Sequence, residues 1–176
     1  MAYNDHPCKI PFLKRACVKK AAALVSEPDP EQQYWGLRVL HALIRGGDWT
    51  TTTENAWKYP SCEECFKIGA VGQAFRCLNT DPEYDLRAFA STLFLGILTD
   101  AMCYRERLRD MGIVPLLIAL TSVKNVNVVE GAMISISNLA GSESMTTTFK
   151  EQDIISICQK VKQFLIYEEG RASHVE

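Results

Sequence analysis

One short pair of cysteines has a spacing that could bind a metal or exchange electrons. Cys62-Glu63-Glu64-Cys65 places two thiols three residues apart. A structural zinc site needs four such ligands, and the sequence has no second pair with comparable spacing. A redox pair of this kind usually opens a helix that follows a strand, and no strand pattern precedes Cys62. We therefore interpret both cysteines as residues on successive turns of one helix, and we expect no metal and no cofactor.

The other reactive residues do not suggest a catalytic group. The three histidines, His6, His41 and His174, are isolated in the sequence. His41 lies within a strong helical pattern, with neither a nucleophile nor a base beside it. Glycine-rich phosphate-binding loops are lacking as well. We predict that the chain is not an enzyme.

Charge and cysteine usage point to a reducing compartment and away from nucleic acid. The chain has 176 residues with 19 Lys and Arg against 21 Asp and Glu, so no surplus of positive charge is available for phosphate contacts. Seven scattered cysteines and a start without a secretory signal pattern favour reduced thiols, hence the cytoplasm or the nucleus. The longest apolar run, residues 113–120, falls short of the roughly 18 residues that span a bilayer. We expect no transmembrane segment.

Two clusters of charge could form binding surfaces. The N-terminal region is basic, with residues that could meet an acidic partner or a membrane surface but that more often form a solvated helix face: Lys9, Lys14, Arg15, Lys19 and Lys20. Residues 105–110 mix both signs, which predicts a surface helix with internal ion pairs.

The elements that carry these residues recur along the chain. Stretches 16–43, 69–98 and 112–140 each begin with a small residue and an apolar helical pattern, pass a polar break and continue as a longer amphipathic run. Gly112 follows Gly69 by 43 residues, whereas Val71 follows Val18 by 53. A fourth start at Asp153-Ile154 matches Met111-Gly112 at an offset of 42. Periods of about 40–47 residues are typical of helical solenoids.

Local signals within each stretch predict helices and no strands. Asp29-Pro30 and Asp81-Pro82 combine a capping carboxylate with proline at the first helical position. Apolar residues within 86–97 and 128–139 recur at spacings of three and four. Residues 113–120 are ambiguous by periodicity alone, and we interpret them as a buried helix. Glycines at helix ends predict left-handed caps at Gly46-Gly47, Gly112 and Gly141.

One unit resembles a known repeat family. The pattern of Val128, Ala132, Met133, Ile136, Asn138 and Leu139 resembles the third helix of an armadillo repeat; 113–120 resembles its second helix and 104–111 its first. HEAT repeats are a close alternative. The resemblance implies an all-α, right-handed superhelix with about three full repeats and a partial fourth. One domain over 1–176 would hold units 9–46, 54–99, 100–141 and 142–169, an irregular insertion at 46–61 and a tail at 170–176.

The resemblance also implies a binding groove. In the family, third helices line a concave groove that binds extended peptides or protein surfaces, often with a ladder of Trp and Asn. Asn138 matches the Asn position, whereas Arg38, Thr92 and Ile134 occupy the Trp position, so the regular ladder is absent. This departure argues against nuclear-signal recognition of the importin kind. One turn earlier, the groove positions would be Trp35, Phe89 and Gly131.

Our expected function is therefore a non-catalytic interaction module that binds a protein or peptide along this groove. The predicted contacts are Trp35, Arg38, Phe89, Thr92, Ile134 and Asn138. Trp49, Trp57 and Tyr59 in the insertion form a second possible hot spot, or fold back to cover a helix end. The alternative is a permanent structural subunit or co-chaperone segment, for example one related to myosin or the cytoskeleton, within a larger complex.

Overall fold

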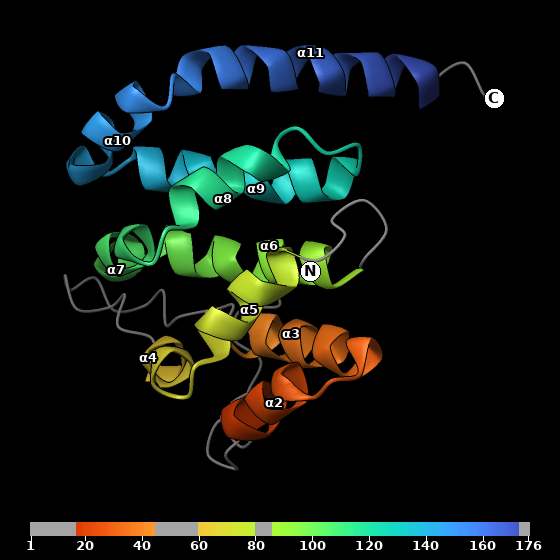
Figure 1. Ribbon diagram of the computed structural model, residues 1–176, viewed down its shortest axis with the longest axis vertical. Helices are drawn as coiled ribbons and strands as arrows, with labels where there is room; N and C mark the ends of the chain where they lie inside the picture. Colours follow the sequence, from red (N-terminus) through yellow and green to blue (C-terminus); the bar gives the residue numbers. More distant parts are fainter. Residues whose placement is uncertain (1–16, 45–59, 80–85, 173–176) are drawn as a thin grey trace, which may run out of the picture.

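A computed structural model describes residues 17–44, 60–79 and 86–172, and within these ranges the chain forms helices and no strands (Figure 1). The all-α prediction is confirmed for this part of the chain. The elements are α2 (Cys17–Ser26), α3 (Pro30–Ile44), α4 (Pro60–Lys67), α5 (Ala70–Leu78), α6 (Leu86–Asp100), η1 (Met102–Tyr104), α7 (Arg105–Asp110), α8 (Ile113–Leu120), α9 (Val126–Ala140), η2 (Glu143–Met145), α10 (Thr146–Glu151) and α11 (Ile154–Ala172).

The helices recur in one order, and the same backbone conformation marks each recurrence. A short helix and a second helix meet at a left-handed residue in three places: Gly69 (φ 76°) between α4 and α5, Gly112 (φ 84°) between α7 and α8, and Asp153 (φ 47°) between α10 and α11. Glycine adopts this conformation without strain, and aspartate is among the few other residues that tolerate it. The structure thus pairs Asp153 with Gly112, one position away from the sequence alignment, which paired it with Met111.

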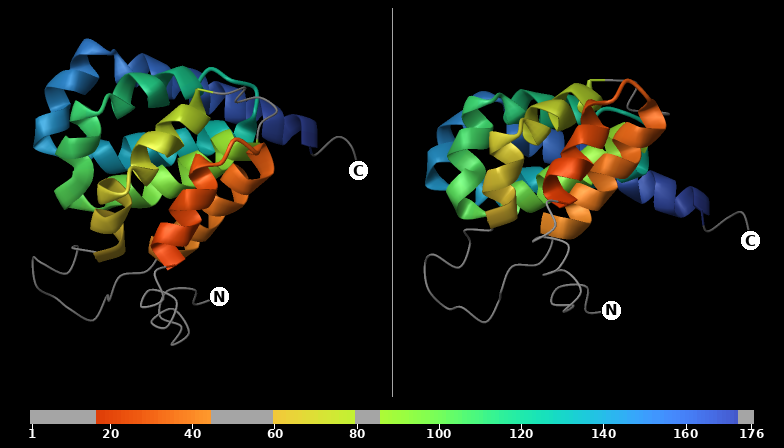
Figure 2. Two further views of the ribbon diagram at one scale, coloured as in Figure 1. Left: turned by 60° about the horizontal axis from the view of Figure 1, so that its bottom comes forward. Right: turned by 90° about the horizontal axis from the view of Figure 1, so that it is seen from below.

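The long helices α3, α6 and α9 lie side by side, with α6 packed between the other two (Figure 1). The shorter helices α5 and α8 pack against α6 and α9, while α2 packs against α3. Figure 2 shows this stack from its lower end, with α2 and α3 foremost. At the opposite end α11 lies beyond α9, and its C-terminal part runs past the helices beneath it (Figures 1 and 2).

Several predicted helix boundaries are confirmed and one is wrong. Asp29 Oδ1 accepts a hydrogen bond from the Glu31 backbone N–H at 2.9 Å, and α3 begins at Pro30 as expected. Gly112 is left-handed as predicted, and residues 113–120 are the helix α8. Gly141 is not left-handed, since its φ is −69°; it follows α9 in an ordinary turn. The predictions at Gly46-Gly47 and Asp81-Pro82 lie outside the described residues.

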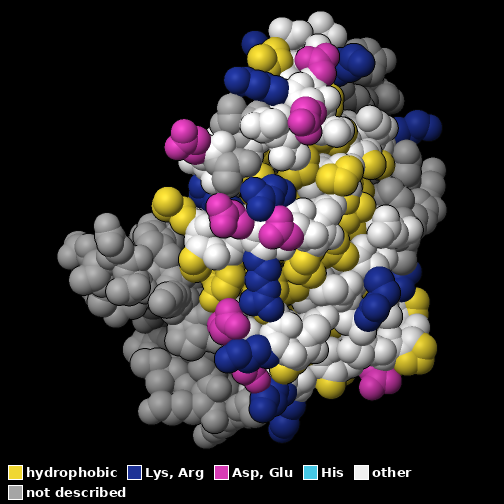
Figure 3. Space-filling model, turned by 60° about the vertical axis from the view of Figure 1, so that its left-hand side comes forward, with side chains coloured by type: hydrophobic (Ala, Val, Ile, Leu, Met, Phe, Trp, Pro, Cys, Tyr) yellow, Lys and Arg dark blue, Asp and Glu magenta, His cyan; other side chains and the backbone are white. Residues whose placement is uncertain are grey.

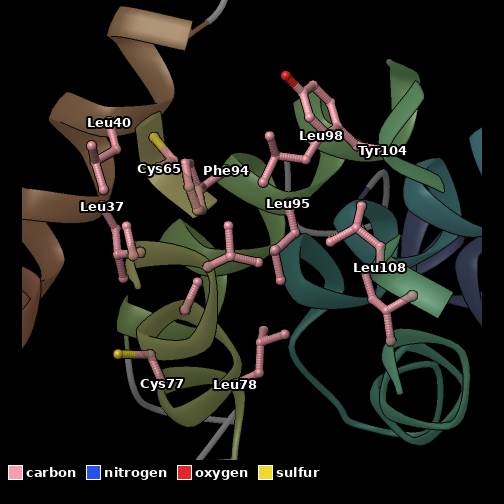
Figure 4. Packing of buried hydrophobic residues seen from close by; sticks show 14 of the residues in the cluster. Leu37, Leu40, Cys65, Cys77, Leu78, Phe94, Leu95, Leu98, Tyr104 and Leu108 are labelled. Atoms are coloured by element: carbon pink, nitrogen blue, oxygen red, sulfur yellow. The ribbon is translucent and has the colours of Figure 1, made fainter. Parts of the chain in front are cut away.

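The core is centred on α6, which carries eight buried residues along its 15-residue length. Figure 4 shows Phe94 and Leu95 of α6 lying between Leu37 of α3 and Leu108 of α7. Each of these four side chains is fully buried, and burial of one such side chain stabilises a fold by about 1.5–3 kcal/mol. The helix α6 is therefore the element that holds both neighbouring long helices in place.

In the described ranges, no single helix has both the length and the apolar composition to cross a bilayer. Leu86–Asp100 and Met102–Asp110 reach that length only when taken together, across a bend of 104°.

Candidate functional site

The cysteine pair is part of the core. Cys62 and Cys65 lie on α4 and are fully buried. Burial, followed by the nearby Glu64 carboxylate, raises the pKa of the Cys65 thiol to about 12. Burial also raises the pKa of Cys62, with smaller contributions from Cys65 and Cys103. Because metals and disulfide exchange both require the thiolate, the environment of this pair opposes either chemistry.

No cluster with metal-binding composition occurs in the described part of the chain, where no group of three or more His, Cys, Asp or Glu could hold an ion. His41 is half-buried on α3, and His6 and His174 lie outside the described residues. Of the other cysteines, Cys77 is buried, Cys17 and Cys158 are half-buried, and Cys103 is exposed. Three of the six described thiols, those of Cys62, Cys65 and Cys77, are therefore buried between helices.

An aromatic stack links α4 to the start of α7. The Phe66 and Tyr104 rings stack with centroids 5.1 Å apart, and the Arg107 guanidinium lies 4.0 Å from the Phe66 centroid. Arg107 Nη1 also lies 3.5 Å from the Glu63 carboxylate. Charged side chains of both signs are interspersed with apolar ones on this side of the molecule (Figure 3). This mixture is a solvated edge that joins two repeats.

The helix at 105–110 is only partly the surface helix that the sequence predicted. Arg109 pairs with Asp110 at 2.8 Å, as an internal ion pair should. Arg105, however, is buried: its Nε donates to Thr99 O at 2.8 Å and its Nη2 to Asp100 O at 3.2 Å. These carbonyls end α6, and the negative end of the helix dipole favours a cation there. Arg105 is therefore a buried helix cap.

One face of the layer of long helices carries apolar side chains in register. On each helix the solvent-facing positions follow a spacing of four and then three residues: Trp35, Val39 and Ala42 on α3; Phe89, Leu93 and Gly96 on α6; Glu130, Ile134 and Ser137 on α9. Leu86 extends this surface at the start of α6. We call these ten residues the α3–α6–α9 face. Its most exposed apolar side chains are Leu86 (61%), Trp35 (54%), Ile134 (50%) and Val39 (41%).

Three of the predicted groove residues lie on this face. Trp35 and Ile134 are exposed, and Phe89 is half-buried. Val39, Leu93 and Leu86 also lie on this face but were not among the predicted contacts. The helical spacing of four residues from Trp35 and Phe89 leads to Val39 and Leu93, each one residue after the predicted Arg38 and Thr92.

Thr92 is a correction to the predicted groove. Its side chain is fully buried between α6 and α9, and its hydroxyl donates to Phe89 O at 2.8 Å. A Cβ added at Gly131 would lie 2.5 Å from Thr92 Oγ1, so Thr92 fills the space that glycine leaves. Gly131 is buried too, and Glu130 takes the exposed position in its place. Neither Thr92 nor Gly131 can contact a partner in this arrangement.

Asn138 and Arg38 are half-buried and engaged within the protein. Asn138 Nδ2 donates to Gly96 O at 3.2 Å and to Thr99 Oγ1 at 3.3 Å, which ties α9 to α6. The Arg38 guanidinium lies 6.0 Å from the centroid of the Tyr34 ring. Asn138 thus uses both amide hydrogens for helix stacking and has none to donate to a bound peptide.

The remaining predicted contacts cannot be placed. Trp49, Trp57 and Tyr59, like Lys9, Lys14 and Arg15, lie outside the described residues. Of the basic residues near the N-terminus that are described, Lys19 lies 3.6 Å from the Glu64 carboxylate and Lys20 is exposed. Glu64 of α4 thus lies close enough to neutralise part of the charge of Lys19.

The fold and this face define a protein built from stacked, repeated helices with an apolar surface on its long helices. No protein-family model, curated protein or solved structure matches the chain.

Proposed function

We propose that the chain is a non-catalytic interaction module of the cytoplasm or nucleus, which binds a protein segment on the α3–α6–α9 face. The observation that carries this proposal is the register of apolar side chains on three successive helices, which are exposed at Trp35, Val39, Leu86 and Ile134 and half-buried at Phe89 and Leu93. Exposed apolar patches of this kind mark interaction sites, and tryptophan is prominent among residues that dominate binding energy. Helices stacked on one another expose one side of a whole layer, which suits an extended partner.

We further propose that the stack is an armadillo-like right-handed superhelix of about three full repeats and a partial fourth. The recurrence of left-handed residues at Gly69, Gly112 and Asp153 supports a common unit of short, second and long helices. In such a superhelix the long third helices, here α3, α6 and α9, would line the concave side.

The test compares capture of partners by two double variants, each of which replaces two exposed apolar side chains. Trp35→Ser with Ile134→Ser removes exposed anchors from the face, and Met102→Ser with Met111→Ser removes exposed apolar side chains elsewhere. The measured quantity is the amount of each protein that the unmodified chain captures from a cell extract. That amount should fall by about tenfold with the first variant, as expected for interface anchors, and stay constant with the second. Equal capture by both variants, with both still folded by circular dichroism, would contradict the proposal.

A permanent subunit or co-chaperone segment is the second candidate, and the end of the stack favours it. Ile155 and Ile166 of α11 are exposed at 70% and 58%, on the helix that nothing in the described chain covers from outside. Such an end face is normally capped in repeat proteins. Light scattering after size exclusion separates the two candidates: a stable monomer supports the interaction module, and aggregation in the absence of a partner supports the subunit.

A further inference from the structure

We infer that the α3–α6–α9 face binds an amphipathic helix with basic flanks, and not an extended peptide. The inference rests on the proposed function and names the class of its partner. It follows from three properties of the face: how few hydrogen bonds it offers, how its apolar rows are spaced, and which charges border it.

The face offers almost nothing to pair with an extended backbone. An extended segment carries an N–H and a C=O at each residue, and burying them unpaired costs free energy. The buried hydroxyl groups of Thr92, Thr99 and Ser135 donate to carbonyls of their own helix. Asn138 spends its amide hydrogens on α6. A helix satisfies its own backbone and needs only the side-chain contacts that this face provides.

The spacing of the rows also suits a helix. Val39, Leu93 and Ile134 occupy the same position on the three helices, and the next such position holds the small residues Ala42, Gly96 and Ser137. Packed helices lie about 8–10 Å apart. Residues seven apart on a partner helix are separated by about 10.5 Å along its axis. One apolar side chain per heptad can therefore pack over the small row on each successive helix.

Acidic side chains lie on the face and at its border. Glu31 and Glu130 are exposed toward the N-terminal ends of α3 and α9, and Asp100 is exposed where α6 ends. Among the described residues, Arg38 lies beside the rows and is half-buried against Tyr34. Lys and Arg on both flanks of the partner's apolar stripe would complement this border.

The test is a selection of displayed random peptides of about 18 residues, long enough to cross three helices. The full 176-residue chain is the bait, with counter-selection against Val39→Ser with Ile134→Ser, whose exposed sites leave the core intact. We expect selected peptides with apolar residues at heptad spacing and basic flanks, which become helical on binding. A central proline in such a peptide should weaken binding by more than about tenfold.

Charge reversal provides the matched control. Glu130→Lys should weaken binding of the selected peptides by about fivefold or more. Glu106→Lys, at an exposed site on α7, should leave their affinity within about twofold of that for the unmodified chain. Selected peptides that depend on the face but tolerate proline and lack heptad spacing would overturn the helical partner and leave the proposed function standing. If no selected peptide depends on the face, the proposed function fails, and this inference fails with it.

Discussion

The contact between Thr92 and Gly131 sets how closely α6 and α9 approach. A Cβ at position 131 would lie 2.5 Å from Thr92 Oγ1 and 2.7 Å from Thr92 Cβ, and the latter atom cannot rotate away. We expect Gly131→Ala to lower the free energy of unfolding by about 1–3 kcal/mol, because overpacking outweighs the better helix propensity of alanine. Urea denaturation followed by circular dichroism measures this change.

Gly72 provides the matched control for this substitution. It lies within α5, and a Cβ there would meet no atom within 4 Å. Gly72→Ala should leave stability unchanged or raise it by up to about 1 kcal/mol, because alanine favours the helix. If both alanine variants shifted the urea midpoint equally, close packing at Gly131 would not be the cause.

The same contact explains why the predicted groove position on α6 was displaced by one residue, to Thr92 in place of Leu93. The family resemblance placed Thr92 in the groove, whereas the structure buries Thr92 and leaves Leu93 half-buried. Thr92 can be buried because its hydroxyl bonds to Phe89 O and because Gly131, distant in sequence, leaves room for it. Helical periodicity locates a stripe to within about one position, and only the neighbouring helix decides which residue lies on it.

At the scale of elements, the end of α6 depends on a residue from the next helix. Arg105→Met should lower the free energy of unfolding by about 2–4 kcal/mol, because it removes two charge-assisted hydrogen bonds and leaves the carbonyls of Thr99 and Asp100 without them. Methionine keeps most of the apolar stem of arginine, so the lost free energy of unfolding reports the contribution of the guanidinium group. Urea midpoints measure the change.

Arg107→Met, on the same helix, is the comparison for that variant. Arg107 is half-exposed and contributes a cation–π contact with Phe66 and a long ion pair, which together are worth about 1 kcal/mol or less. If Arg107→Met lowered the free energy of unfolding more than Arg105→Met, burial of the arginine would not control the loss of stability. The sequence treated both arginines alike, since a run of mixed charge carries no sign of which member turns inward.

At the scale of the molecule, the helix junctions at Gly69 and Gly112 could be predicted from the sequence because they depend on local chemistry. Glycine at 69 and 112 marks the junction of two helices by its left-handed conformation, and the apolar pattern repeats with it. Asp153 holds the same place in the structure without being glycine, so the alignment of the last unit slipped. The binding role of the face cannot be read in this way, because exposure depends on all three long helices together.

A stack of helices should open from its ends, and α11 packs less tightly than α6. Of the described α11 side chains only Val161 is buried, whereas α6 has eight buried residues. A cavity of about 380 Å³ also separates α11 from α8 and the turn that follows, lined by Ile118, Thr121, Ser122, Val123, Lys124, Ile157, Lys160 and Val161. We expect backbone amides of 154–163 to exchange hydrogen at least about a hundredfold faster than those of 90–98, because local opening at an end needs little loss of packing. Hydrogen exchange followed by mass spectrometry of peptic fragments gives both rates, and equal protection of the two segments would show that the stack unfolds as a single cooperative unit.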